Sequence, residues 1–163
     1  MEAVRLLAEQ GARVLFLCFN RALADHVEAA LDLPEEGPVM ARNFHRLCTW
    51  AGHAIGRPLE YPDSKDAEVQ RVFWEETAPA TLLDAIAEGV LPTFDAIVLD
   101  EGQDFAPDWW TVVEELLTDP SEGRLTVFLD AAQNIFGRPG AVPEMPSSYP
   151  LKYNFRNTRR ICE

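Results

Sequence analysis

Four polar residues that directly follow an apolar run are the residues best suited to chemistry. Residues 96–99 read Ala-Ile-Val-Leu, and Asp100, Glu101, Gln103 and Asp104 come after them. A carboxylate at a strand end can hold Mg²⁺ on a nucleotide phosphate, while a neighbouring glutamate can polarise an attacking water. An acidic turn that caps the next helix explains a lone Asp-Glu pair better. The set Asp-Glu-x-Gln-Asp is rarer and favours a functional site.

The elements that must position this cluster are apolar runs alternating with helical patterns. Runs near 13–18, 39–43, 95–100 and 125–130 predict strands of a parallel sheet. Three of them, all except 39–43, have the composition of strands that are buried on both faces. Helical spacing follows or precedes each run, so the order of elements predicts an α/β fold with helices on both faces. The helical patterns cover residues 2–10, 20–31, 64–78, 81–89 and 107–117.

Particular residues predict where these helices begin and end. Asn20 and Ser64 are suited to helix N-caps, and Pro107 is suited to the first turn of a helix. Gly11 and Gly89 stand where a helix C-terminal glycine belongs. The block from 46 to 93 is helical and irregular, which predicts a small helical insertion within one domain of 163 residues.

Composition limits the partners. Acidic residues outnumber basic ones by 27 to 14, which gives a net charge of −13. Nucleic-acid binding then depends on a local basic patch or on a partner domain, because phosphate contacts need Lys and Arg. Cys18, Cys48 and Cys162 form no CxxC pair, which favours a reduced, cytoplasmic setting. No apolar run reaches membrane-spanning length and no signal-peptide pattern is present, so we expect no membrane association.

Five stretches resemble the motifs of the UvrD/Rep-like superfamily 1 DNA helicases. Residues 99–105, Leu-Asp-Glu-Gly-Gln-Asp-Phe, resemble the Walker B motif. In the family's order, motifs Ia, Ib, III and IV are similar to residues 14–24, 43–48, 127–137 and 151–161. The resemblance implies a RecA-like P-loop NTPase fold. It also implies ATP hydrolysis coupled to movement along single-stranded DNA in the complete protein.

The same resemblance implies roles for the acidic cluster. Asp100 would bind the Mg²⁺ of Mg²⁺-ATP, and Glu101 would orient or deprotonate the water. Gln103 and Asp104 would link the ATP site to the segment 127–137, which is similar to motif III.

Two further residues receive roles at the phosphates of ATP. Gln133 would sense the γ-phosphate through its amide. Arg156 would be an arginine finger, since its planar, permanently charged fork suits the charge on a transferring phosphoryl group. Without the flanking Asn-Phe-Arg-Asn-Thr, Arg156 is better explained as a surface arginine near Arg159 and Arg160.

A second set of residues would meet single-stranded DNA by stacking and backbone contacts, which read no sequence. These residues are Phe19, Asn20, Arg21, Phe44, His45 and Phe136. For Phe19 and Phe44, which lie in strand-like runs, packing in the core is an equally strong alternative.

The departures from the family pattern concern the loop that binds the phosphates and one aromatic position. The family begins with a Walker A loop whose amides and lysine cradle the phosphates, but the only lysines here are Lys65 and Lys152, and neither follows a glycine loop. Leu129 replaces the glycine of motif III, and residues 137–140 replace its aromatic-Arg-Gly end. Motifs V and VI are missing too. We therefore expect a partial motor domain that is inactive alone and lacks the Walker A strand, which leaves an open sheet edge.

The expected organisation has three parts. Residues 1–45 and 94–150 form a RecA-like core, residues 46–93 an insertion, and residues 151–163 the start of a second motor lobe. The expected partners are single-stranded DNA, ATP and the remaining helicase domains. Two alternatives stay open. One is a degenerate, non-catalytic ATPase module that binds a partner. The other, less favoured, is a metal-dependent phosphodiesterase that uses Asp100, Glu101 and Asp104 as ligands, although no H-x-D or E-x-K spacing supports it.

Overall fold

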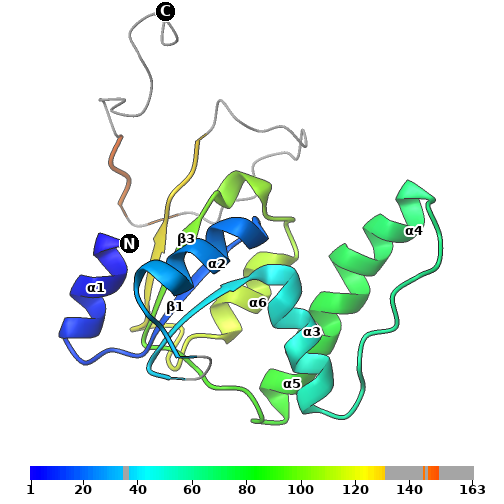
Figure 1. Ribbon diagram of the computed structural model, residues 1–163, viewed down its shortest axis with the longest axis horizontal. Coiled ribbons are helices and arrows are strands. Elements are labelled where there is room, and N and C mark those ends of the chain that lie inside the picture. Colours follow the sequence, from blue (N-terminus) through cyan, green and yellow to red (C-terminus); the bar gives the residue numbers. More distant parts are fainter. Residues whose placement is uncertain (35–36, 131–144, 146, 151–163) are drawn as a thin grey trace, which may run out of the picture.

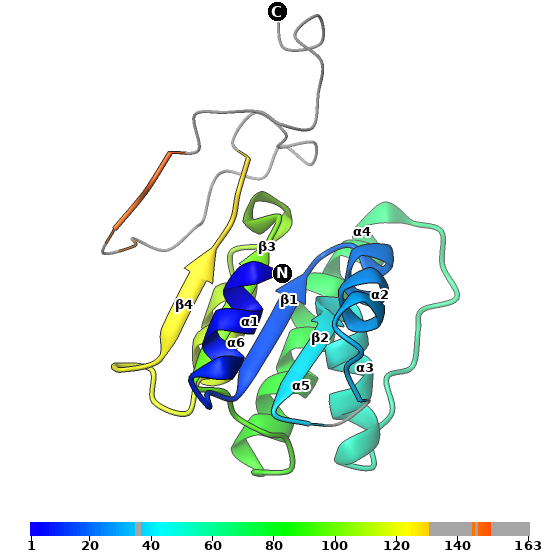
Figure 2. The same cartoon turned by 60° about the vertical axis from the view of Figure 1, so that its left-hand side comes forward.

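A parallel sheet of four strands lies at the centre of the computed structural model, which describes residues 1–34, 37–130, 145 and 147–150. The strands are β1 (Val14–Cys18), β2 (Val39–Asn43), β3 (Ala96–Asp100) and β4 (Arg124–Val127). Their order across the sheet is β2-β1-β3-β4, and every neighbouring pair is parallel. All four arrows therefore point the same way in Figure 2, so all the carboxyl ends meet at one edge.

Helices α1 (Glu2–Glu9) and α2 (Arg21–Ala30) cover one face of the sheet (Figures 1 and 2). Alternate residues of β1, such as Val14 and Phe16, point to this side because successive side chains of a strand face opposite ways. They pack in one buried cluster with Val27 of α2. The charged residues of both helices, such as Arg5 and Asp25, lie on their exposed sides.

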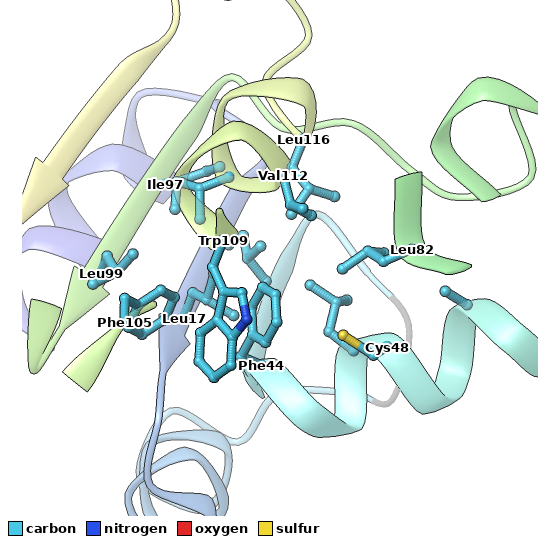
Figure 3. Packing of buried hydrophobic residues seen from close by; sticks show 14 of the residues in the cluster. Leu17, Phe44, Cys48, Leu82, Ile97, Leu99, Phe105, Trp109, Val112 and Leu116 are labelled. Atoms are coloured by element: carbon cyan, nitrogen blue, oxygen red, sulfur yellow. The ribbon is translucent and has the colours of Figure 1, made fainter. Parts of the chain in front are cut away.

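Three helices cover the other face, and this side holds the larger part of the core. They are α3 (Phe44–Ala54), α5 (Ala78–Ala87) and α6 (Trp109–Glu115). Leu15 and Leu17 of β1 point to this side. The ring of Phe44 stacks on that of Trp109 with centroids 4.1 Å apart, and both residues are fully buried (Figure 3).

Within the range 46–93, residues 46–54 and 67–87 are helical, and these helices share the core of the sheet. Leu47 and Leu82 belong to the same buried cluster as Leu15. The region thus completes one of the two layers that cover the sheet, because α3 and α5 both carry buried apolar residues and pack against each other.

The two helices predicted at 64–78 and 81–89 are one helical run in the structure. Helix α4 (Ala67–Val72) continues as a π-helical turn, η1 (Phe73–Thr77), and then as α5. Pro79 lies in the first turn of α5 and cannot donate a backbone hydrogen bond, which explains a widened turn just before it. The N-cap is Asp66, whose carboxylate accepts from two backbone amides, and the prediction of Ser64 was wrong.

Strand β4 is shorter and more exposed than predicted. It ends at Val127, and Phe128 and Leu129, expected inside a buried strand, are 40% and 48% exposed. The reason is its position, since β4 is the edge strand and pairs only with β3 in the described part of the chain. A run of apolar residues cannot distinguish a central strand from an edge strand.

The predicted fold class is confirmed. The protein is α/β, with a parallel sheet and helices on both faces, and this arrangement is consistent with a RecA-like fold. Asn20 caps α2 as predicted, and Gly11 and Gly89 follow helix ends with φ angles of 81° and 68°. Among the described residues, no helix is long and apolar enough to cross a membrane.

Candidate functional site

The topology itself marks one place at the edge of the sheet. From β1 the chain moves outward to β2 and later returns to β3 on the opposite side of β1. In open α/β sheets, ligands bind beyond the carboxyl ends of the strands where the order reverses in this way. At that point Cys18, the last residue of β1, lies in register with Asp100 on β3 and with Asn43 on β2.

The chain turns sharply after β3, and Glu101 makes the turn. Glu101 has φ 57° and ψ 45°, a left-handed conformation that non-glycine residues rarely adopt. Its backbone amide donates a 3.0 Å hydrogen bond to Oδ1 of Asp100. Residues held in such conformations occur preferentially at functional sites, where the surrounding structure compensates for the strain.

Gln103 holds the side chain of Glu101 and joins it to the end of the edge strand. Its Nε2 donates to Oε2 of Glu101, and its Oε1 accepts a 3.0 Å hydrogen bond from the backbone amide of Asp130. Only one orientation of the amide satisfies both partners, because a carboxylate accepts and a backbone N–H donates. Asp104 closes the short 3-10 helix η2 (Gly102–Asp104), with its amide donating to the carbonyl of Glu101.

Gly102 is a residue of this site that the sequence reasoning missed. A Cβ at this position would lie 2.7 Å from Cγ1 of Val127 on β4. Its amide donates a 2.9 Å hydrogen bond to the carbonyl of Phe128, and the amide of Phe128 donates to the carbonyl of Leu99. The turn after β3 thus packs directly against the edge strand, and the small residue between Glu101 and Gln103 was the available signal.

Cys18 lies beside the acidic cluster but has the properties of a core thiol. Its Sγ donates to the carbonyl of Asn20 at 3.1 Å. Burial, followed by the negative charge of Asp100, raises the pKa of the Cys18 thiol to about 12. Since the thiolate is the nucleophilic form, Cys18 is not a nucleophile at neutral pH.

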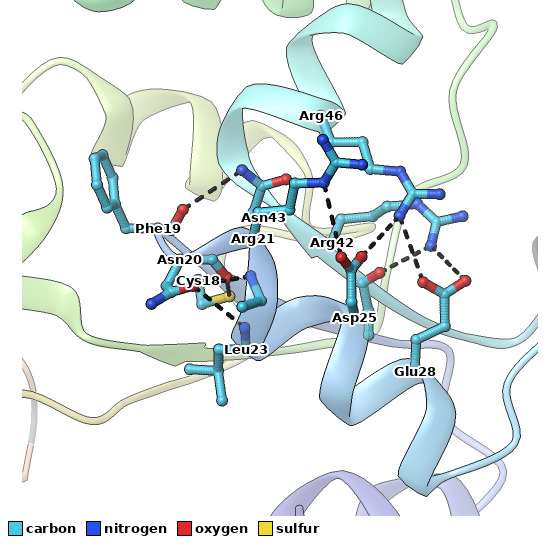
Figure 4. A network of polar contacts seen from close by, with 12 residues as sticks. Cys18, Phe19, Asn20, Arg21, Leu23, Asp25, Glu28, Arg42, Asn43 and Arg46 are labelled. Carbon is cyan, nitrogen blue, oxygen red and sulfur yellow. Dashed lines mark hydrogen bonds and ion pairs between the residues drawn. The ribbon is translucent and has the colours of Figure 1, made fainter.

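The polar residues after β1 and β2 form the charged network of Figure 4. Asn20 caps α2 by accepting from two backbone amides, at 2.8 and 3.3 Å. Arg21 lies 3.7 Å from Asp25, and Arg46 lies 3.3 Å from Asp25 and 3.5 Å from Glu28. The positive charge expected in this region is present, but carboxylates on α2 offset much of it.

A buried arginine anchors the same network to the sheet. Arg42 has a side chain only 6% exposed and lies 3.4 Å from Glu28. Its guanidinium also donates to the carbonyl of Ala41 at 2.8 Å. Nearby, Asn43 donates a 3.4 Å hydrogen bond to the carbonyl of Phe19. These contacts tie the ends of β1 and β2 together and fix the positions of the residues that follow them.

The two phenylalanines predicted to meet nucleic acid have different positions. Phe19 is half-buried, and its ring contacts that of His45 in a T-shaped arrangement with centroids 5.2 Å apart. Phe44 is fully buried beneath Trp109. A base cannot stack on Phe44 in this structure, so the core-packing alternative holds for it, while Phe19 and His45 remain at the surface.

Three of the predicted site residues lie outside the described residues: Gln133, Phe136 and Arg156. The roles implied for them stay predictions. Among the described site residues, Asp100, Glu101, Gln103 and Asp104 lie together after β3, and Phe19 and His45 are in ring contact after β1 and β2.

The fold and this edge define an α/β protein with a cluster of carboxylate and amide side chains at the switch point of its sheet, which is the place where the strand order reverses. No family model matches the chain, and no curated protein matches it. The function is therefore argued from the site itself.

Proposed function

We propose that this chain is part of the motor domain of an ATP-dependent DNA helicase or translocase of the UvrD/Rep-like kind. The observation that carries the proposal is the arrangement of Glu101. Its carboxylate is fixed at the switch point by Gln103, whose other end is bonded to the backbone of Asp130. A carboxylate held in this way can orient a water for attack on a phosphoryl group.

The residues present fit a Mg²⁺ ion that is shared with phosphates. Asp100 ends β3 at the same edge and offers one carboxylate. Mg²⁺ on a nucleotide needs only one or two protein carboxylates, because phosphates and waters complete its six ligands. Bound Mg²⁺-ATP would supply the phosphoryl group and the charge that activates it. Asp100 would position the ion, and Glu101 would hold the water and accept its proton.

The loop that cradles the phosphates is the part that this sequence does not supply. No glycine loop ending in Lys-Ser or Lys-Thr occurs in the chain. Another segment or the remaining helicase domains must provide it, and the edge strand β4, which pairs only with β3 among the described residues, offers a place for a further strand. Arg156 is proposed to complete the site from a second lobe.

Single-stranded DNA is proposed to pass over the same edge of the sheet. Asn20 and Arg21 follow the carboxyl end of β1, and His45 follows that of β2, at the edge of the sheet that also carries the acidic cluster. Arg21 is 79% exposed and Arg46 40% exposed, so both can reach phosphates from their present positions. A shared edge would allow ATP hydrolysis and DNA movement to influence each other through Gln103 and the segment after β4.

The phosphodiesterase alternative loses support in the structure. Among the described residues, no three His, Cys, Asp or Glu side chains are grouped so that they could hold a metal ion. Asp100, Glu101 and Asp104 thus do not form the metal centre that this alternative needs. A degenerate module without turnover remains the competing proposal, because it requires the fold and the site but no phosphate loop.

Nucleotide binding to the isolated chain tests the first part of the proposal. We expect weak binding of ATP that requires Mg²⁺, and no measurable hydrolysis. In Asp100→Asn, addition of Mg²⁺ should no longer strengthen the binding of ATP. Equilibrium dialysis with labelled nucleotide measures the affinity, and Asp63→Asn, an exposed carboxylate on the loop before α4, is the control. Binding that ignores both Mg²⁺ and Asp100 would contradict the proposed site.

A measurement of ATP hydrolysis distinguishes the proposed motor domain from the degenerate, non-catalytic module. A form of the protein that also carries a phosphate loop and the second lobe should hydrolyse ATP, and single-stranded DNA should stimulate the rate. A complete form that binds DNA without any turnover would identify the non-catalytic module.

A further inference from the structure

A small pocket with aromatic walls lies between the end of β1 and the start of the helical run 67–87. Its volume is about 190 Å³. Phe19 and His45 line it from the carboxyl edge of the sheet, and Trp109 lines it from α6. The opposite wall is one face of the helical run, whose residues recur at intervals of three and four: Ala67, Gln70, Arg71 and Trp74. None of the roles assigned above uses this wall.

The rings of the pocket are held in place by one another. His45 lies against Trp74 with ring centroids 4.0 Å apart, and Phe19 meets His45 edge-on at 5.2 Å. Trp109 is fully buried, and its Nε1 donates a 3.0 Å hydrogen bond to the backbone carbonyl of Trp74. That bond ends on the main chain, so it does not depend on the side chain of Trp74.

These contacts decide what kind of group the pocket can take. Because His45 lies against Trp74, this pair of rings leaves no slot for another flat ring. A cation has a looser requirement, since an aromatic face attracts it from within about 6 Å of the ring centroid. Pockets for whole drug-sized ligands typically measure about 300–1,000 Å³. A volume of about 190 Å³ therefore suits a single side chain.

The charges around the pocket favour a cation. The guanidinium of Arg71 binds both carboxylate oxygens of Glu68, at 2.7 and 2.9 Å, and contacts Glu75 at 3.0 Å, so these three residues have a net charge of −1. Residues 60–76 as a whole contain six acidic and two basic residues, a net charge of −4. A hollow surrounded by one sign of charge concentrates ions of the opposite sign.

We propose that this pocket is a docking site for an arginine side chain of a partner protein. A guanidinium stacks on aromatic faces, binds carboxylates through its planar fork, and is more weakly hydrated than an ammonium. The apolar stem of the side chain can lie along the walls formed by Ala67 and Phe19. The acidic residues of the segment 60–76 then face the basic residues that flank the docked arginine. This interaction is separate from the proposed motor function.

Fluorine NMR on the full chain tests the proposal. The chain contains four tryptophans, and labelling with 5-fluorotryptophan gives four ¹⁹F signals that single Trp→Phe variants assign. The probe is the peptide acetyl-Lys-Gly-Arg-Gly-Lys-amide. We expect it to shift the Trp74 signal and to leave the signal of Trp50, which does not line the pocket, in place. The affinity should fall as salt is added, because exposed charges are screened.

Two analogues of the peptide identify the group that is bound. Citrulline in place of arginine keeps the shape and removes the charge, so this peptide should bind about two- to thirtyfold more weakly, the range that corresponds to one cation–π contact. Lysine in place of arginine keeps the total charge and removes the planar fork, and it should also weaken binding. Tetramethylammonium, a small cation without a peptide, should bind more weakly than the arginine peptide.

Variants then locate the effect. Trp74→Ala should lower the affinity for the arginine peptide to that for the citrulline peptide, while Trp74→Phe, which keeps an aromatic face, should retain part of the difference. Val69→Ala, an exposed position on α4 outside the pocket, is the matched control and should change neither affinity. If Trp74→Ala does not fold, Trp74→Phe and the two analogues still decide.

Four results would overturn the proposal. These are a Trp74 signal that the arginine peptide does not shift, equal affinity for the arginine peptide and either analogue, a preference for arginine that Trp74→Ala leaves intact, and tetramethylammonium binding as tightly as the peptide. The last result would indicate a site for a small quaternary ammonium ligand. None of these measurements involves ATP or DNA, so the outcome does not depend on the motor function.

Discussion

At the scale of single residues, the site depends on how one carboxylate is held. Glu101 follows the strand end in a left-handed conformation, and Gln103 binds its side chain. A free carboxylate on a turn would occupy several rotamers, and only some of them would face a substrate at the switch point. The hydrogen bond from Gln103 selects one rotamer and couples it to the backbone of Asp130.

The first expected outcome concerns Glu101 and Gln103. In a form of the protein that hydrolyses ATP, Glu101→Gln should abolish turnover and leave nucleotide binding nearly unchanged, because it removes the group that handles water and keeps Asp100. Gln103→Ala should lower kcat by a smaller factor, about tenfold or more, since general-base contributions of about 10²–10⁴ depend on position. Steady-state ATPase assays measure both. Normal hydrolysis by Glu101→Gln would refute the assigned role.

The second outcome concerns the buried thiols. Burial raises the pKa of Cys18 to about 12, and burial also raises the pKa of Cys48. In a Cys162→Ser variant, Ellman's reagent at pH 8 should detect no reactive thiol in the folded chain and two in urea. A rapidly reacting thiol in the folded chain would show that one of these cysteines is accessible.

The same shift of the Cys18 pKa predicts how stability changes with pH. Between the ordinary thiol pKa of 9.0 and about 12, the unfolded chain has lost the proton that folded Cys18 keeps. The unfolded state then binds fewer protons, so the free energy of unfolding falls as pH rises through this window. Below pH 9 this thiol contributes no pH dependence. Urea denaturation of Cys18→Ala and of the parent chain at pH 8 and pH 10 isolates the contribution.

At the scale of elements, the edge strand and the turn after β3 act as one unit. Gly102 packs against Val127, and two backbone hydrogen bonds join the turn and β3 to Phe128. A change at Gly102 is therefore transmitted to β4 and to Asp130, and through Gln103 back to Glu101. The π-helical turn of the helical run 67–87 places Trp74 in the wall of a pocket that Phe19 and His45 also line.

The third outcome tests the contact between the turn and the edge strand. Gly102→Ala should destabilise the fold by about 1–3 kcal/mol, the usual effect of overpacking, because the new Cβ would lie 2.7 Å from Val127. Urea denaturation measures the change. The double variant with Val127→Ala removes the clash, so the two effects should be far from additive. Additive effects would mean that the contact is not the cause.

At the scale of the whole molecule, charge would govern the proposed interaction with nucleic acid. A net charge of −13 repels phosphates over most of the surface. The basic residues near the carboxyl edge are partly offset by Asp25 and Glu28. Binding by the isolated chain should be weak and should depend on a few local contacts.

The fourth outcome follows from this charge distribution. Affinity for single-stranded DNA should fall steeply with salt, and Arg21→Ala should reduce the slope of log K against log salt by about 0.7, the value for one phosphate contact on a single strand. Fluorescence anisotropy at several salt concentrations measures the slope. Arg57→Ala is the control, because Arg57 is paired with Asp84 and Glu88 on α5 and beyond its end. Tight binding in high salt would contradict the expectation.

The sequence alone determined the fold class and the place of the acidic cluster. Buried strands and amphipathic helices have different periods, so β1, β2 and β3 were found nearly to the residue. The cap at Asn20 and the glycines at 11 and 89 were found because these residue types suit local backbone geometry. The acidic cluster was found because all parallel strands end at one edge, so a residue that follows a strand has a known location.

Only the tertiary structure decided features that depend on contacts between distant segments. It placed β4 at the edge, buried Phe44 under Trp109, and packed Gly102 against Val127. It also joined Glu101 to Asp130 through Gln103 and brought Trp74 to His45. Periodicity records which side of an element is apolar, but not which partner covers that side. Strand order and side-chain packing across the sheet set the partner, and no local pattern encodes them.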